Sequence, residues 1–193
     1  GFYTDFLWFD SLEATSVFTT QIYTKIGLFA VFALVMALVV FAVMWWAWRT
    51  RPEFRGMTPE QASLERYREA VEPFRTRLAI GIAIVMGLFA GFAASAEWDS
   101  FLMWRNATDF GQTDPQFGMD LSFFVFTLPF IQYLLGFGFA VLLLSLIAAV
   151  VVQYLYGGLR LQPKGDRATG AAQTQVSILI ALILFLKAVS YWF

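Results

Sequence analysis

The stretch IGLFAVFALVMALVVFAVMWWAW, residues 26–48, is apolar from end to end. An α-helix rises about 1.5 Å per residue, so a run of this length crosses a hydrocarbon core of about 30 Å. Runs of similar composition occupy residues 78–96, 130–156 and 174–193. No water is present inside a bilayer to satisfy backbone amides, and a single span satisfies them only as a helix. The sequence therefore predicts an all-α membrane protein with four transmembrane helices.

The composition agrees with this class of protein and excludes several chemistries. Hydrophobic residues make up 59% of the 193 residues and charged residues 14%, whereas a soluble domain carries about 25% charged residues. The net charge of −1 gives no reason to expect a nucleic-acid partner. Cys and His are absent, which excludes thiolate nucleophiles, disulfides, Cys/His zinc sites and imidazole catalysis. We expect no enzyme activity, no catalytic residues, no cofactor and no metal.

The basic residues between the apolar runs are distributed unevenly, and this predicts the orientation of the helices. Residues 49–77 contain seven arginines and residues 157–173 contain three basic residues, whereas residues 97–129 contain only Arg105. Basic residues in short loops stay on the cytoplasmic side of a membrane. We therefore expect the loops 49–77 and 157–173 to be cytoplasmic and the loop 97–129 to be extracytoplasmic.

Two flanking segments are predicted to lie along a membrane surface. In residues 1–25 acids interrupt the aromatic residues, which is typical of an outer interfacial segment. Residues 16–25 are expected to rise as a helix into the first span. Residues 58–74 are predicted to form a short amphipathic cytoplasmic helix, with Thr58 as N-cap and Pro59 at the first helical position. We favour a helix lying on the inner membrane surface or packed under the bundle, because its acids offset much of its basic charge. The alternative is a docking face for anionic lipid or a partner.

Small residues recur at every fourth position through the second span, and they are predicted to pack against another helix. The row consists of Ala79, Ala83, Gly87, Gly91 and Ser95. Such a row forms a groove in which a second backbone can approach closely. We favour packing inside this bundle over a surface for a second subunit or a lipid chain.

Lys187 is the only charged residue deep within a predicted span. An intramembrane charge is by default a candidate functional group, and Glu97 and Asp99 at the outer end of the second span are its candidate partners. The interpretation we prefer is that Lys187 extends its ammonium group to the outer headgroups. Gln132 and Gln153 lie near the ends of a span and are predicted to be interfacial.

The outer loop combines acids with a dense aromatic segment. Asp114-Pro-Gln-Phe-Gly118 has the composition of a turn. The acids Asp109, Asp114 and Asp120 could suit calcium, but their spacing does not match an EF-hand. The Phe-rich residues 121–130 are expected to lie in the headgroup region, with a lipid-accessible site as the alternative.

Several short runs, in matching order and spacing, carry a family resemblance. They are DFLWF at 5–9, SVFTT at 16–20, PEQ at 59–61, LERYR at 64–68, GLFAG at 87–91, TDPQFG at 113–118, FVF at 124–126 and YLYGG at 154–158. Together they resemble a large bacterial membrane protein family, uncharacterised protein family number zero-one-eight-two, which occurs in actinobacteria and cyanobacteria. The resemblance implies a protein several times longer, with about seven N-terminal spans and a large extracytoplasmic domain. It brings no established catalytic residues.

The resemblance implies that this chain supplies the second to fifth spans of such a protein. The start at Gly1 and the end inside an apolar run lead to the same expectation of missing portions. We expect a multi-pass protein of the bacterial plasma membrane that anchors a larger cell-envelope protein. Its expected partners are membrane lipid and other membrane subunits or missing parts of its own chain. The alternative function is transport of a hydrophobic envelope molecule or lipid along the helix bundle.

Overall fold

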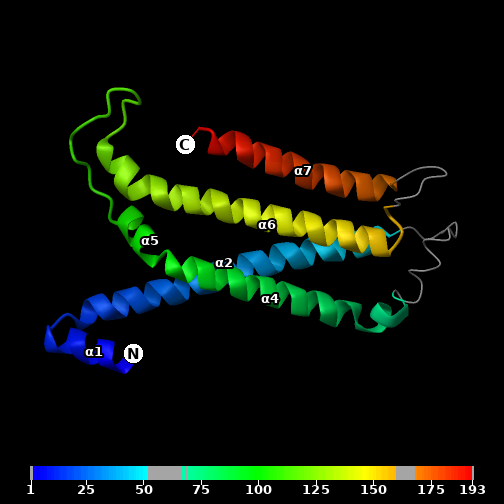
Figure 1. Ribbon diagram of the computed structural model, residues 1–193, viewed down its shortest axis with the longest axis horizontal. Coiled ribbons are helices and arrows are strands. Elements are labelled where there is room, and N and C mark those ends of the chain that lie inside the picture. Colours follow the sequence, from blue (N-terminus) through cyan, green and yellow to red (C-terminus); the bar gives the residue numbers. More distant parts are fainter. Residues whose placement is uncertain (1, 52–66, 68, 160–167, 193) are drawn as a thin grey trace. The chain divides into compact units, whose positions relative to one another are not determined.

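Every regular element in the described part of the chain is helical. The computed structural model describes residues 2–51, 67, 69–159 and 168–192 (Figure 1). Four of its helices are long and apolar enough to cross a membrane: Thr15–Arg49, Glu69–Ala96, Phe123–Leu155 and Gly170–Ser190. The predicted fold class, an all-α protein with four such helices, is confirmed. Most of the cytoplasmic helix predicted at residues 58–74 lies outside the described residues.

Each long helix begins before the apolar run that predicts it. In chain order the helices are α1 (Phe2–Ser11), α2 (Thr15–Arg49), the 3-10 helix η1 (Glu72–Phe74), α4 (Arg75–Ala96), α5 (Trp98–Arg105), the π-helix η2 (Phe123–Thr127), α6 (Leu128–Leu155) and α7 (Gly170–Ser190). Hydropathy marks only the part of a helix that suits hydrocarbon. The backbone hydrogen bonds of α2 continue through the more polar residues 15–25, so this helix begins well before the apolar run.

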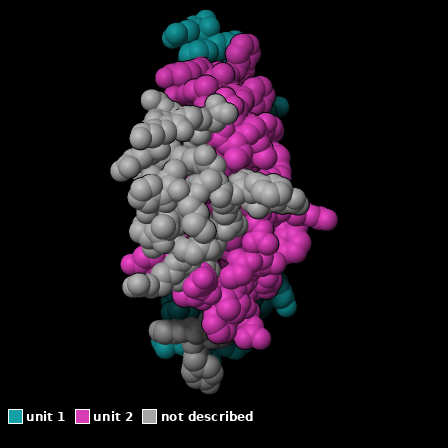
Figure 2. Space-filling model, turned by 90° about the vertical axis from the view of Figure 1, so that its right-hand side faces the viewer, with its two compact units in different colours: residues 1–35, 87–133 teal, residues 36–86, 134–193 magenta. Residues whose placement is uncertain are grey.

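The described chain separates into two compact units, coloured separately in Figure 2. Unit 1 comprises residues 1–35 and 87–133, and unit 2 comprises residues 36–86 and 134–193. Unit 1 thus holds α1, the first part of α2, the last part of α4, α5 and the outer loop. Unit 2 holds the complementary parts of α2 and α4, most of α6, and α7.

In unit 1 a tight turn folds α1 back onto α2. Glu13 adopts a left-handed conformation with φ 54°. The amide of Ala14 donates to the Phe9 carbonyl at 2.9 Å, and the amide of Glu13 donates to the Asp10 carbonyl at 3.0 Å. This is the hydrogen-bond pattern of a Schellman motif, which closes the end of a helix. The turn places the Phe9 ring against Phe18, with ring centroids 5.5 Å apart.

In unit 1 the backbones of α2 and α4 approach closely at Gly91. A Cβ atom added to Gly91 would lie 2.8 Å from the Phe29 carbonyl oxygen and 3.0 Å from Ala33 Cβ. The Phe29 and Phe92 rings meet edge to face beside this contact, with centroids 5.0 Å apart. The contact requires a residue without a side chain, and Gly91 is buried there.

In unit 2 buried amide side chains connect three helices. Gln153 of α6 donates from Nε2 to Gln175 Oε1 of α7 at 2.8 Å. Gln175 in turn donates from Nε2 to the Val43 carbonyl of α2 at 2.8 Å. Both glutamines have an exposed fraction of 0%. The prediction that Gln153 is interfacial is therefore wrong, because its side chain turns into the bundle and finds a partner there.

Helices α6 and α7 run alongside each other, as Figure 1 shows. Besides the Gln153–Gln175 bond, they meet at Gly138, where an added Cβ would lie 2.9 Å from Leu186 Cδ2. Helix α6 ends in a second Schellman motif. Gly157 has φ 76°, its amide donates to the Tyr154 carbonyl, and the amide of Gly158 donates to the Gln153 carbonyl at 2.7 Å.

We predict that Gly91→Ala destabilises the protein, because the new methyl group must displace the Phe29 backbone. Overpacking of this kind costs about 1–3 kcal/mol. Gly27→Ala is the matched control. Gly27 is also a helical glycine of unit 1, but nothing lies within 4 Å of its Cβ position. Replacing a helical glycine by alanine in open space is neutral or stabilising. Thermal unfolding in detergent micelles measures both effects, and equal melting temperatures for the two variants would contradict the proposed contact.

Candidate functional site

The outer loop of unit 1, between α5 and η2, is folded around two aspartates. Asp114 Oδ1 accepts the amides of Gln116 and Phe117, each at 2.8 Å. The amide of Gly118 donates to the Asp114 carbonyl at 2.9 Å. A turn that begins with Asp and closes on its own side chain is an Asx-turn. The turn predicted at residues 114–118 is confirmed.

Asp120 fixes the other side of the loop. Its Oδ1 accepts the amides of Phe110 at 3.1 Å and Ser122 at 2.8 Å, and its Oδ2 accepts the amide of Gly111 at 2.8 Å. Contacts with Ser122, from its side chain and then its amide, together with the other two amides, lower the pKa of Asp120 to about 2. Hydrogen bonds to the ionised form of a carboxyl group favour ionisation. The carboxylate therefore substitutes for a backbone partner where no helix is present.

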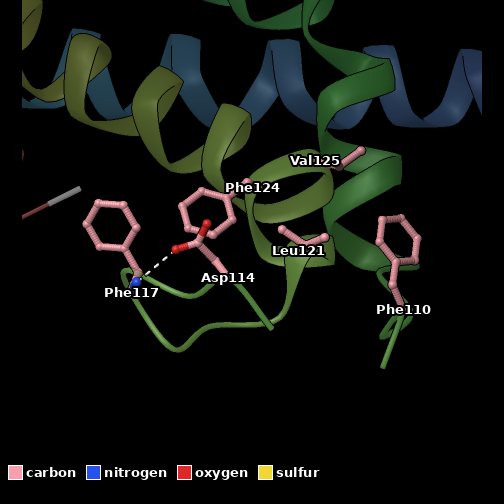
Figure 3. Close-up of a pocket in the computed structure, with 6 residues that line it drawn as sticks. All are labelled: Phe110, Asp114, Phe117, Leu121, Phe124 and Val125. Carbon is pink, nitrogen blue, oxygen red and sulfur yellow. Dashed lines mark hydrogen bonds between the residues drawn. The ribbon is translucent and has the colours of Figure 1, made fainter. Parts of the chain in front are cut away.

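The loop and the π-helix η2 line an open apolar cavity of about 500 Å³ (Figure 3). Its lining residues are Phe110, Asp114, Phe117, Leu121, Phe124 and Val125. The Phe117 and Phe124 rings pack with centroids 5.8 Å apart, and Phe110 packs edge to face on Phe126 at 5.4 Å. Phe117 remains 59% exposed. We call this cavity the outer groove, and its chemistry suits an apolar ligand.

The π-helix shapes one wall of the outer groove. An extra residue in the turn of residues 123–127 changes the directions in which successive side chains point, and such turns occur often at functional sites. Phe124 and Val125, which are consecutive residues of this turn, both line the groove. The sequence predicts an aromatic segment here, but it carries no signal for a π-turn.

The structure places the predicted row of small residues in both units. Ala79 and Ala83 are buried, as are Gly87 and Gly91, whereas Ser95 is half-buried. Within unit 1 the neighbour of Gly91 is α2, as described above. The Ser95 hydroxyl donates to the Phe92 carbonyl of its own helix. Whether the row also serves assembly with other chains stays a prediction.

The structure describes Lys187 and its candidate partners Glu97 and Asp99, but it does not test their pairing. Lys187 is exposed on α7, and its Nζ lies 4.5 Å from the centroid of the Tyr191 ring. Glu97 and Asp99 belong to unit 1, where Glu97 accepts the Ser100 hydroxyl at 3.0 Å and Asp99 accepts the Ser100 amide at 2.8 Å. Because Lys187 belongs to the other unit, its pairing with these carboxylates stays a prediction.

Sequence reasoning missed a charged cluster in unit 2. Glu72 Oε1 accepts hydrogen bonds from Arg51 Nη1 at 2.9 Å and from Arg75 Nη1, and Glu72 Oε2 accepts the Tyr156 hydroxyl at 2.7 Å. The cluster joins the end of α2, η1, the start of α4 and the end of α6. Tyr156 and Glu72 are 84 residues apart in the chain, so no local pattern reveals the pairing.

The described residues contain no group of three or more His, Cys, Asp or Glu side chains that could hold a metal ion. The carboxylates of Asp114 and Asp120 each accept backbone amides of the loop instead. The two acids therefore have a structural role in the loop that does not involve calcium.

Comparisons with known proteins assign the whole chain to one family. The model of the Uncharacterised protein family (UPF0182) matches residues 1–193. Over 192 residues the chain is 50% identical to a UPF0182 protein of Streptomyces coelicolor, 50% identical to one of a Nocardioides species and 44% identical to one of Thermobifida fusca. These alignments cover 100% of this chain and 19% of each relative. The chain thus spans about a fifth of the length of these curated relatives. No solved structure matches it significantly.

We predict that Asp120 titrates near pH 2, below its usual pKa of 3.8. Because the pKa of the folded state is lowered, the contribution of Asp120 to loop stability is complete above about pH 3.8. It disappears as the pH falls through about 2. The carboxyl ¹³C chemical shift of Asp120 in micelles measures the midpoint, and Asp120→Asn assigns the signal. A midpoint at or above 3.8 would show that the three amide contacts do not form.

Proposed function

Because the chain belongs to the Uncharacterised protein family (UPF0182) and spans 19% of its longer relatives, we propose that it is a membrane-anchoring region of a larger cell-envelope protein. The observation that carries the proposal is the set of four helices long and apolar enough to cross a membrane. In this proposal they hold the rest of the protein in the bacterial plasma membrane. We propose no catalytic role.

The side chains on the outer faces of these helices support the proposal. Leu34 and Leu38 of α2 are 59% and 58% exposed, and Leu184 and Phe185 of α7 are 64% and 67% exposed. Large apolar patches on a soluble protein are aggregation sites or interaction sites. In a bilayer the same faces contact lipid tails or other helices without cost. The proposed partners are therefore membrane lipid and further membrane helices, from other subunits or from the same protein.

The proposed orientation follows the basic residues. The ends of α2 and α6 and the start of α7 lie on the cytoplasmic side, and the outer groove lies on the extracytoplasmic side. A membrane-impermeant thiol reagent tests this directly, because the chain contains no cysteine that would react in the background.

We predict that Ala107→Cys is labelled in intact cells, whereas Gly170→Cys is labelled only after the membrane is permeabilised. Both positions are exposed and lie outside the apolar runs. In the same cells, alkaline carbonate extraction should leave the full-length protein in the membrane pellet. Labelling of Gly170→Cys in intact cells would reverse the orientation. Release of the protein by carbonate would end the anchoring proposal.

The second candidate function is transport of a hydrophobic envelope molecule or lipid, and the outer groove is the observation that favours it. The groove is open and lined almost entirely by apolar side chains. Ligand sites for small molecules are commonly apolar clefts with a few polar groups, and Asp114 supplies such a group here. In this proposal Lys187 lies along the route of the molecule.

We predict that a diazirine-bearing fatty acid cross-links to residues 110–125 when the protein is reconstituted in vesicles. Phe117→Asp and Val125→Asp should lower this labelling severalfold, because each puts a charge into an apolar wall. Leu12→Asp is the control, since Leu12 is 56% exposed and lies outside both the groove and the apolar runs. Equal labelling of all variants would show that the cross-linking reflects non-specific lipid contact and not binding in the groove. With a labelled lipid in hand, normal transport by Lys187→Met would exclude a role for that charge.

A further inference from the structure

The charged cluster around Glu72 in unit 2 has an excess of positive charge. Two guanidinium groups, from Arg51 and Arg75, face the single carboxylate of Glu72. A guanidinium carries five N–H donors in a planar fork. The contacts with Glu72 use one nitrogen, Nη1, of each arginine. Among the described residues, the cluster therefore retains a net charge of about +1. Several of its N–H groups remain as donors for an additional anion.

Aromatic rings hold both guanidinium groups in place. The Arg51 guanidinium carbon lies 5.7 Å from the centroid of the Tyr156 ring, and that of Arg75 lies 5.9 Å from the Trp48 ring. Cation–π contacts of this kind orient the flat face of a guanidinium towards the ring. A guanidinium that stacks on a ring carries its N–H groups at its edge, where an anion can approach. Tyr156 is itself fixed by its hydrogen bond to Glu72.

The two arginines are accessible from outside. Their side chains are 38% and 39% exposed, so a ligand can reach them without any rearrangement of the helices. The same side of each helix continues with exposed apolar residues. Trp45 precedes Trp48 by three residues on α2, Leu78 follows Arg75 by three residues on α4, and these positions are 45% and 49% exposed. Residues three apart on a helix are neighbours on its surface.

We propose that Arg51 and Arg75 bind the phosphate group of an anionic phospholipid, with its acyl chains lying along the surface marked by Trp45 and Leu78. Arginine edges match phosphate oxygens in a bidentate geometry. Basic sites between helices on the cytoplasmic side of a membrane attract anionic headgroups. A free phosphate ion would use the same donors, but it would gain nothing from the adjoining apolar surface. The site therefore takes a lipid.

Glu72 competes with the phosphate in this arrangement. Its carboxylate occupies one N–H of each arginine and offsets one of the two positive charges. Removing the charge of Glu72 should consequently strengthen lipid binding. A cluster that served only to hold the helix ends together would show no such gain, so the sign of this effect separates the two roles.

The test uses the chain purified in an uncharged detergent, with binding of short-chain phosphatidylglycerol measured by native mass spectrometry. We expect Arg51→Gln and Arg75→Gln each to weaken binding about tenfold, through loss of a charged hydrogen bond. Glu72→Gln should tighten it severalfold. Arg49→Gln removes the same charge from an exposed residue outside the cluster and should change affinity less than twofold. Melting temperatures in the same detergent establish that each variant is folded.

Two comparisons identify the ligand. Phosphatidylcholine of equal chain length should bind at least tenfold more weakly, because its headgroup has no net charge. Glycerol phosphate, which has the anion but no acyl chains, should also bind at least tenfold more weakly. The proposal is overturned if Glu72→Gln weakens binding, or if folded Arg51→Gln and Arg75→Gln variants behave like Arg49→Gln. Glycerol phosphate that bound as tightly as the lipid would overturn it too, and would identify a soluble phosphate ligand instead.

Discussion

The bundle of unit 2 depends on a relay of amide groups across three helices. Gln175 bonds at once to the Gln153 side chain and to the Val43 carbonyl, so its one side chain fixes α7 against both α6 and α2. Apolar contacts alone give little preference for one helix arrangement in lipid, because lipid tails are as apolar as leucine. Interhelical hydrogen bonds are worth only about 0.6–2 kcal/mol each in membranes. Their value here is directional, since the two hydrogen bonds can form in few relative positions of the helices.

The outer loop follows the same constraint in a different form. Its backbone leaves the helical pattern between α5 and η2, so its amides need other acceptors. Asp114 and Asp120 supply them, and together they accept five backbone amides. The aromatic side chains are thereby held outward in a fixed arrangement. The apolar cavity is thus a product of polar contacts beneath it.

The fold class could be predicted from the sequence because the bilayer imposes helices on long apolar runs. The turn at residues 114–118 could also be predicted, since Asp, Pro and Gly restrict the backbone locally. The role of Gln153 could not, because a polar residue near the end of a span can face either the headgroups or the bundle. The partners of Glu72 could not be predicted for a related reason. Arg75 is only three residues from Glu72, but Arg51 and Tyr156 come from separate segments, and only the folded chain brings them to the same carboxylate.

The paired glycines at the end of α6 have a consequence for how this region can vary. Gly157 permits the left-handed turn. Gly158 leaves space for the Gln153 side chain, because a Cβ atom at 158 would collide with the Gln153 side-chain oxygen. The Gln153 amide therefore packs directly against Gly158 while it donates to Gln175. A larger residue at 158 displaces the end of the Gln153 side chain, which carries the hydrogen bond to Gln175 of α7. The residue at 158 thus affects the hydrogen bond that residue 153 makes, so a backbone turn on one helix bears on a contact of its neighbour.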